Sequence, residues 1–236
     1  MPFRWLPLLD SGWWVPPVRC KCPGAQVEFV RKQDEKRLEA DRERAHERQG
    51  LLKKSGLPVK YHTATFAAAD TTEANREALA KMAAFAARPD GGMFLTGPVG
   101  TGKTYLAACV VNYRLDKLEW TTFGNVVSLL SRIKQSYDDF SREAEWEIIN
   151  ELSTVPVLVL DDLGKDRATE WAEQILYQVI DTRYRENRPI VATSNFALPD
   201  LQEQYPNVGP AIVSRLVEMC QGVKIVGFDW RMRRLG

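Results

Sequence analysis

Short apolar segments alternate with longer helical segments along most of this chain. The five short segments are Met93 to Thr96, Trp120 to Phe123, Val155 to Leu160, Ile190 to Thr193 and Val223 to Val226. The helical segments between them are roughly Lys103 to Leu118, Val126 to Tyr137 with Arg142 to Leu152, Thr169 to Arg185, and Pro210 to Cys220. Strands that alternate with helices predict an α/β fold in which a five-stranded parallel sheet is flanked by helices on both faces.

A further helix is predicted just before the first strand. Asp70 and Glu73 have the spacing of a capping box, which places the start of the helix there. The helix ends at the turn-forming sequence of residues 89–92. Its apolar face consists of Leu79, Met82, Ala83 and Ala86.

The chain changes character near residue 60. Residues 1–24 are rich in Trp and Pro, whereas residues 25–54 carry opposite charges three or four positions apart, which favours a solvent-exposed helix. The apolar positions of this helix are too sparse for a deep core. We interpret it as an exposed arm, with docking of a partner as the sharper alternative. The predicted domains are therefore a small helical N-terminal extension, residues 1–60, and an α/β domain, residues 61–236.

Composition narrows the class of protein. The 236 residues suffice for one sizeable domain with a short appendage. The formal net charge of +1 means that nucleic acid would have to be bound by local patches and not by the molecule's overall charge. No run approaches the roughly 20 apolar residues of a membrane span. We expect a cytoplasmic protein with no membrane partner.

The strongest chemical signal is the sequence GPVGTGKT, residues 97–104, which lies between a predicted strand and a predicted helix. Glycines let backbone N–H groups turn inward and approach phosphate oxygens closely, and the amino end of the helix adds a positive dipole. Lys103 is placed to contact the β- and γ-phosphates, and the Thr104 hydroxyl to ligate Mg²⁺. The pattern predicts a binding site for ATP and Mg²⁺ made of Gly97, Pro98, Val99, Gly100, Thr101, Gly102, Lys103, Thr104 and Tyr105.

A second signal is the pair Asp161 and Asp162, which ends the apolar run VLVL. The carboxyl ends of parallel strands are where an open α/β sheet binds its ligands. We predict that Asp161 holds Mg²⁺ and that Asp162 orients or deprotonates the attacking water. Asn195, which follows the strand IVATS, is predicted to contact the attacking water or the γ-phosphate.

Arg215 lies in the helix that begins at Pro210. An arginine there can complete the site of a neighbouring subunit, because its charge would neutralise the transferring phosphoryl group. The alternative is a surface arginine on an amphipathic helix.

These four elements, in this order, resemble the AAA+ ATPases of the ASCE division of P-loop NTPases. The sequences TEWAEQILYQVIDTRYRENRPIVATSN, IVSRLVEM and GFDWR are similar to those of the DnaC/DnaI family of replicative helicase loaders. The resemblance implies Walker A at residues 97–104, Walker B at Asp161 and Asp162, sensor 1 at Asn195, and Arg215 as a finger acting in trans. It also implies a DnaB-type hexameric helicase and single-stranded DNA as partners, with Mg²⁺-dependent ATP hydrolysis as the switch.

Few residues follow the last predicted strand, so we expect no C-terminal helical lid, and a neighbouring subunit would then cover the nucleotide.

Several readings of function stay open. The related IstB transposition helpers share this core, so a regulator of transposition acting on duplex DNA is the main alternative. A small-molecule kinase and a nucleotide-gated adaptor with negligible turnover are the others.

The N-terminal extension carries two further features. Many relatives have two cysteine pairs there, whereas this chain has Cys20 and Cys22 alone, which make half of a tetrahedral zinc site. Zinc is therefore not expected as a cofactor. Local charge that suits single-stranded DNA is supplied by Arg19, Lys21, Lys53, Lys54, Arg231, Arg233 and Arg234, with Trp230 or Tyr137 as stacking platforms.

Overall fold

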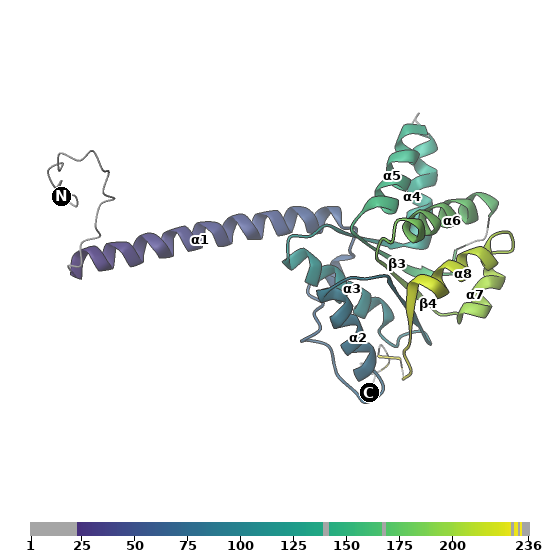
Figure 1. Ribbon diagram of the computed structural model, residues 1–236, viewed down its shortest axis with the longest axis horizontal. Helices are drawn as coiled ribbons and strands as arrows, with labels where there is room; N and C mark the ends of the chain where they lie inside the picture. Colours follow the sequence, from purple (N-terminus) through teal and green to yellow (C-terminus); the bar gives the residue numbers. More distant parts are fainter. Residues whose placement is uncertain (1–22, 139–141, 167–168, 228, 231, 233–236) are drawn as a thin grey trace, which may run out of the picture. The chain divides into compact units, whose positions relative to one another are not determined.

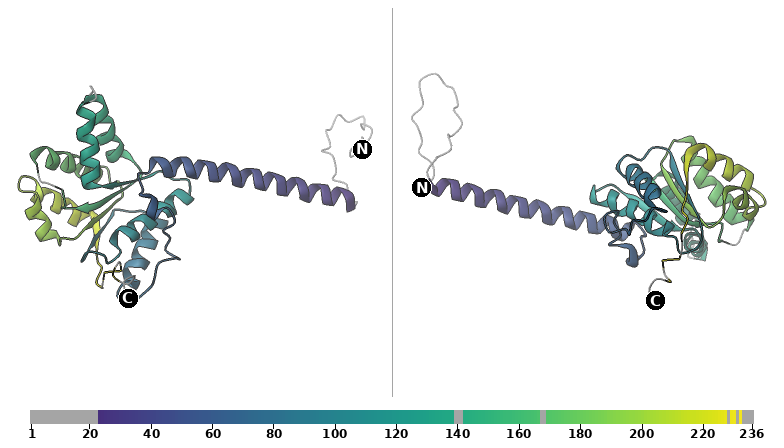
Figure 2. Two further views of the ribbon diagram at one scale, coloured as in Figure 1. Left: turned by 180° about the vertical axis from the view of Figure 1, so that it is seen from behind. Right: turned by 90° about the horizontal axis from the view of Figure 1, so that it is seen from below.

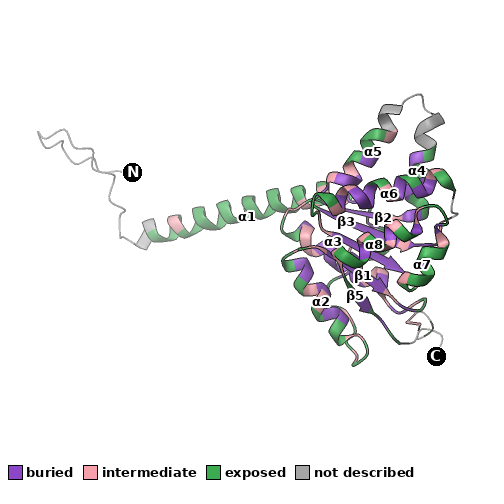
Figure 3. Cartoon of the chain, turned by 45° about the vertical axis from the view of Figure 1, so that its right-hand side comes forward, coloured by how far each residue is buried: buried purple, intermediate pink, exposed green. Residues whose placement is uncertain are grey.

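The structure is a computed structural model that describes residues 23–138, 142–166, 169–227, 229–230 and 232, without the side chains of residues 23–25 and 135–144. The chain divides into two compact units, Met1–Glu47 and Arg48–Gly236. In the first unit the described residues belong to helix α1, which spans Pro23–Lys54. Its surface is almost entirely exposed (Figure 3), and ion pairs four residues apart, such as Arg31–Glu35, line it.

The second unit contains a five-stranded sheet in which all neighbouring strands are parallel, in the order β2-β3-β4-β1-β5. The predicted α/β fold is thus confirmed. The strands are β1 (Gly92–Thr96), β2 (Thr121–Asn125), β3 (Val157–Leu163), β4 (Ile190–Ser194) and β5 (Cys220–Lys224). The helices are η1 (Val59–Tyr61), α2 (Arg76–Ala87), α3 (Lys103–Asp116), α4 (Val126–Asp138), α5 (Arg142–Thr154), α6 (Glu170–Arg185), α7 (Leu198–Gln204) and α8 (Gly209–Met219).

Two hydrophobic layers hold the sheet. Alternate residues of one strand point to opposite faces, so Met93 and Leu95 of β1 pack with α2 and α3, whereas Phe94 packs with α4 to α8. Figures 1 and 2 show α2 and α3 on one side of the sheet and α6 and α8 on the other. Both faces are buried (Figure 3), as a parallel sheet requires.

The capping box predicted at Asp70 and Glu73 is wrong. Helix α2 begins at Arg76, with Asn75 as its N-cap residue and no side-chain capping bond. The Asn75 side chain instead accepts from the Thr72 N–H at 2.7 Å and donates to the Asp70 carbonyl at 2.8 Å. The Asn75 side chain therefore closes a local turn before the helix in place of the predicted capping box.

The last strand also differs from its prediction, because β5 begins at Cys220 and not at Val223. It is an edge strand that pairs with β1 alone among the described strands, and Val223 is its single buried residue. An edge strand buries little, so its sequence is polar and an apolar run does not mark its start. Helix α7, which has seven residues, was not predicted.

Candidate nucleotide-binding site

The phosphate loop joins β1 to α3 at the carboxyl edge of the sheet. Gly100 and Gly102 have φ of 79° and 95°, a backbone conformation that residues with a Cβ rarely adopt. Gly102 is also the N-cap residue of α3, so the loop leads directly into the positive end of the helix dipole. The local sequence thus fixes the turn that directs backbone N–H groups toward a phosphate.

Side chains of the loop are tied to the loop's own backbone. Lys103 is 5% exposed, and its ammonium donates to the carbonyls of Gly97 at 2.7 Å and Pro98 at 2.8 Å. The Thr101 hydroxyl donates to the same Pro98 carbonyl at 2.9 Å. The cation therefore already lies within the loop, where a polyphosphate would need it.

The acidic pair lies within β3, two strands from the loop. Asp161 is buried, and Asp162 has φ of 63°. The pairing of β3 with β4 shifts register between Leu160 and Leu163, so the strand bulges at the two carboxylates. Bulges re-aim side chains, and this one turns consecutive carboxylates toward different partners.

Thr193 of β4 links the two carboxylates. Its hydroxyl donates to Asp161 Oδ1 at 2.7 Å and accepts from the Asp162 N–H at 3.0 Å. Thr193 is fully buried. Strand β4 lies between β1 and β3, so its end is placed between the phosphate loop and the acidic pair. Sequence reasoning missed this role; its only signal was a hydroxyl residue at the end of an apolar strand.

The surroundings of Asp161 suit a hard cation. Burial raises the pKa of its carboxyl, hydrogen bonds from the Thr193 and Thr104 hydroxyls lower it, and the neighbouring Asp162 charge raises it, with a net upward shift. A cation placed beside the carboxylate would favour its ionised form. Oxygen donors are what Mg²⁺ prefers, and its sites usually keep waters and substrate phosphates as further ligands. Thr104 and Asp161 therefore fit the predicted metal site.

Asp162 is less buried, and two side chains hold it. Lys165 pairs with its Oδ1 at 2.8 Å, and the Asn125 amide at the end of β2 donates to its Oδ2 at 3.4 Å. Asn125 was missed in the sequence, where it follows a short strand without a distinguishing pattern. The structure brings it to the acidic pair because β2 is the neighbour of β3.

Two predicted site residues lie at the margin. Asn195 directly follows β4, and the β4 hydrogen bond to the acidic pair comes from Thr193, two residues earlier. The Tyr105 hydroxyl donates to the Thr65 carbonyl at 3.1 Å, so this residue joins α3 to the segment that precedes α2. Contact of either residue with nucleotide stays a prediction.

The segment after β5 passes along the phosphate loop. The Ile225 N–H donates to the Thr96 carbonyl at 2.7 Å, and the Trp230 N–H donates to the Gly100 carbonyl at 3.1 Å. Any Cβ on Gly100 would collide with the Asp229 carboxylate. A side chain at Gly100 would therefore require the Asp229 carboxylate to move, and it would also strain the backbone.

Arg215 of α8 has partners within its own chain. It pairs with Asp181 of α6 and donates to the Tyr177 hydroxyl at 2.8 Å and to the Ala211 carbonyl at 3.1 Å. Its side chain is 20% exposed. Action in trans stays a prediction, and the contacts show that this arginine is held in place.

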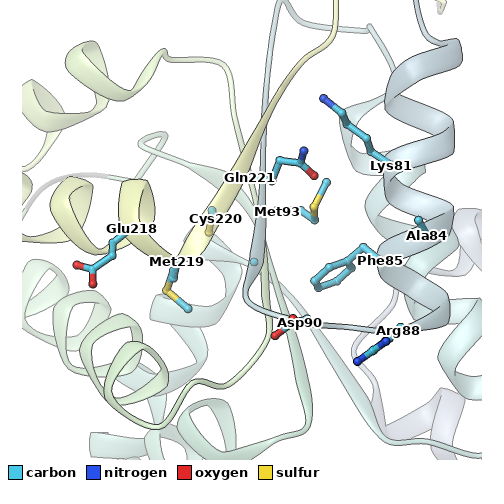
Figure 4. Close-up of a pocket in the computed structure, with 11 residues that line it drawn as sticks. Lys81, Ala84, Phe85, Arg88, Asp90, Met93, Glu218, Met219, Cys220 and Gln221 are labelled. Carbon is cyan, nitrogen blue, oxygen red and sulfur yellow. The ribbon is translucent and has the colours of Figure 1, made fainter.

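A pocket of about 600 Å³ lies at the opposite, amino end of β1 and β5 (Figure 4). Phe85 and Arg88 of α2, Met93 of β1, and Met219 and Cys220 line it. None of the predicted site residues lines this pocket, so it is separate from the phosphate loop. Burial raises the pKa of the Cys220 thiol to about 12.

Some predictions fall outside the described residues. These are the half zinc site at Cys20 and Cys22 and the basic residues Arg19, Lys21, Arg231, Arg233 and Arg234. The side chain of Tyr137 is likewise not described. Among the described helices, none has the length and apolar character that crossing a membrane requires.

A parallel sheet of this order, with a phosphate loop after β1 and an acidic pair on β3, defines a P-loop ATPase with the AAA+ fold. The chain belongs to the family of IstB-like ATP-binding proteins, whose model matches residues 26–235.

Relatives in this family have assigned roles. The replicative helicase loader DnaI of Bacillus subtilis (strain 168) is 30% identical over 115 residues, which are 48% of this chain and 36% of that protein. The replicative helicase loader DnaC of Escherichia coli (strain K12) is 26% identical over 147 residues, 61% of this chain and 58% of that protein. The match thus spans about a third to three fifths of these relatives.

Solved structures agree on the fold. A DnaC helicase loader gives a TM-score of 0.63 at 23% identity, covering 72% of this chain and 100% of that chain. The replication initiator DnaA, bound to AMPPCP and single-stranded DNA, gives 0.63 at 20% identity, with 73% and 51% covered. At such identities the likeness establishes the fold alone.

Proposed function

We propose that this protein is an ATP-driven loader that places a hexameric replicative DNA helicase on single-stranded DNA. The observation that carries the proposal is the similarity of its ATPase segment to DnaI and DnaC, both named replicative helicase loaders. The site supplies what a nucleotide switch needs, namely a phosphate loop and two carboxylates linked through β4.

The proposed chemistry is Mg²⁺-dependent hydrolysis of ATP. Loop N–H groups and Lys103 bind the β- and γ-phosphates, and Thr104 and Asp161 hold Mg²⁺. The ion would neutralise charge on the phosphate oxygens. Asp162 orients the attacking water, and its contacts with Lys165 and Asn125 fix the carboxylate. Arg215 of a neighbouring copy would stabilise the charge that develops on the γ-phosphate.

Helix α1 is the element that we propose docks on the helicase. Val27, Val30 and Leu38 are 70%, 54% and 53% exposed. At 100° per residue they lie on one face of the helix, because their spacings of three and eleven residues are close to whole turns. An exposed apolar stripe on a charged helix suits the groove of a protein partner.

The test is size-exclusion chromatography of the full-length protein mixed with its host's replicative helicase, in ATP and then in ADP. We expect co-elution that depends on nucleotide and is lost in Val30→Glu/Leu38→Glu. The control is Lys32→Gln/Lys36→Gln, which makes the same change in charge on the opposite face and should still co-elute. Absence of a complex in both nucleotides would overturn the proposal, and filaments on duplex DNA would then favour the transposition-type regulator.

A further inference from the structure

Arg215 of α8 contacts side chains of α6, and these two helices pack against each other (Figure 1). Its Nε donates to Asp181 Oδ1, its Nη1 to the Ala211 carbonyl and its Nη2 to the Tyr177 hydroxyl. The guanidinium also lies 4.7 Å from the centre of the Tyr177 ring and 5.7 Å from that of Tyr184. A freely moving surface arginine would not have this set of contacts.

These hydrogen bonds do not use all of the N–H donors of the guanidinium. An arginine has five N–H donors, one on Nε and two on each terminal nitrogen. The three bonds named above use one donor on each nitrogen, so among the residues that the structure describes one donor on each terminal nitrogen of Arg215 has no hydrogen-bond partner. Two parallel N–H groups on one planar edge are the arrangement that binds two oxygens of a phosphate.

The carboxylate that orients Arg215 is shared with a second arginine. Asp181 is shared, because its Oδ2 pairs with Arg185 at 2.8 Å while its Oδ1 pairs with Arg215. Asp181 therefore faces two arginines at once, one on each carboxylate oxygen. The Tyr184 hydroxyl donates to Glu218 Oε2 at 2.8 Å, which fixes the second ring near the guanidinium. Asp181 and the Tyr184–Glu218 pair therefore both help to hold Arg215 in place.

We propose that Asp181 and Tyr177 are positioning residues for Arg215, which they hold with two N–H groups ready for the γ-phosphate of ATP bound by a second copy of this chain. The inference rests on the proposed function, in which Arg215 acts in trans. A long side chain that is already ordered loses less conformational freedom when it meets its target, so transition-state binding is strengthened. Neither residue touches the reacting atoms; each acts through Arg215.

The experiment separates the copy that supplies the arginine from the copy that hydrolyses ATP. The acceptor is full-length Arg215→Ala, which keeps its own phosphate loop and acidic pair. The donor is full-length Asp162→Asn, which keeps the phosphate loop but lacks the carboxylate proposed to orient water. The two are mixed with single-stranded DNA and excess donor, and phosphate release is followed over many turnovers.

We expect the Asp162→Asn donor to restore turnover to the acceptor. A donor that also carries Asp181→Asn or Tyr177→Phe should restore at least about ten-fold less. The loss should fall on kcat more than on KM for ATP, because the contact of the arginine with the γ-phosphate strengthens as charge develops in the transition state. The control donor adds Glu186→Gln. Glu186 lies just beyond the end of α6, and its carboxylate pairs with Arg188. It should restore as much as Asp162→Asn alone.

Each outcome decides a different point. Equal rescue by all donors would overturn the positioning role and leave the arginine in trans intact. No rescue by Asp162→Asn itself would overturn action in trans, and the positioning role with it. Unfolding temperature and ATP binding of every donor are measured in parallel. If Asp181→Asn lowers the unfolding temperature, Tyr177→Phe decides the result, since it removes one hydroxyl and keeps the ring.

Discussion

At the scale of single residues, the acidic pair depends on a hydroxyl that sequence reasoning passed over. The strand IVATS and the following Asn195 drew attention to the right sheet edge, yet the side chain that bonds to both aspartates is Thr193. Side chains two residues apart on a strand point to the same face, so the sequence does not show which of them reaches the acidic pair. Thr193 could therefore be identified only from the structure. The phosphate loop, in contrast, was predicted residue by residue, because its chemistry lies in one continuous segment.

Replacing Thr193 by Val tests this link. The variant keeps the shape of the side chain and leaves a buried carboxylate oxygen and a partly buried N–H without their partner. We expect the free energy of unfolding to fall by about 1–3 kcal/mol and ATP turnover to fall by about ten-fold. Chemical denaturation and phosphate release measure the two effects. Thr193→Ser retains the hydroxyl and should keep most of the activity; equal loss in both variants would contradict the assignment.

The two described cysteines make stability depend on pH. Burial raises the pKa of the Cys109 and Cys220 thiols from an ordinary 9.0 to about 12. Unfolded thiols ionise first, so the stability these groups contribute is fully present below pH 9 and is lost as pH rises toward 12. Urea denaturation between pH 8 and 10.5 should show a steeper loss for this protein than for Cys109→Ala/Cys220→Ala. Parallel curves would contradict the prediction.

At the scale of elements, tertiary contacts decide where segments begin and end. Ser55 and Leu57, which follow α1 in what reads as a flexible SGLP sequence, are buried in the second unit, where the Ser55 carbonyl accepts from the Phe123 N–H. Local composition suggested only the end of the helix. The apolar strands β1, β3 and β4 were found because burial on both faces makes them continuously apolar, and β5 was misplaced because it is an edge strand.

Arg183 joins several elements from the interior. It is fully buried, and its guanidinium donates to carbonyls at the end of α5, before β3 and before β4, those of Leu152, Ser153, Val155, Pro156 and Pro189. Arg183→Met leaves these acceptors without a donor, so we expect unfolding free energy to fall by about 3–5 kcal/mol. Arg185→Met, two residues on and exposed, should cost less than about 1 kcal/mol. Similar losses, measured by urea denaturation, would argue against the role of Arg183.

At the scale of the whole molecule, nucleotide should stabilise the folded chain. Ligand that binds only the native state adds about 2.7 kcal/mol at a concentration one hundred times its Kd. We expect ATP with Mg²⁺ to raise the unfolding temperature, and Lys103→Ala to lose most of that rise, because the loop would lack its cation. Differential scanning fluorimetry with and without ATP and Mg²⁺ checks this. Lys117→Ala, a surface lysine beyond the end of α3, should respond as the unaltered protein does.

The sequence by itself determined the alternating α/β architecture, the phosphate loop and the acidic pair. Each of these is written in consecutive residues, since helix and strand periods and glycine conformations are local properties. Tertiary structure alone decided that β4 lies between β1 and β3, which brings Thr193 to Asp161, and that α6 and α8 pack so that Asp181 meets Arg215. Strand order and helix packing follow from how all the apolar faces are buried together, and no single segment contains that information.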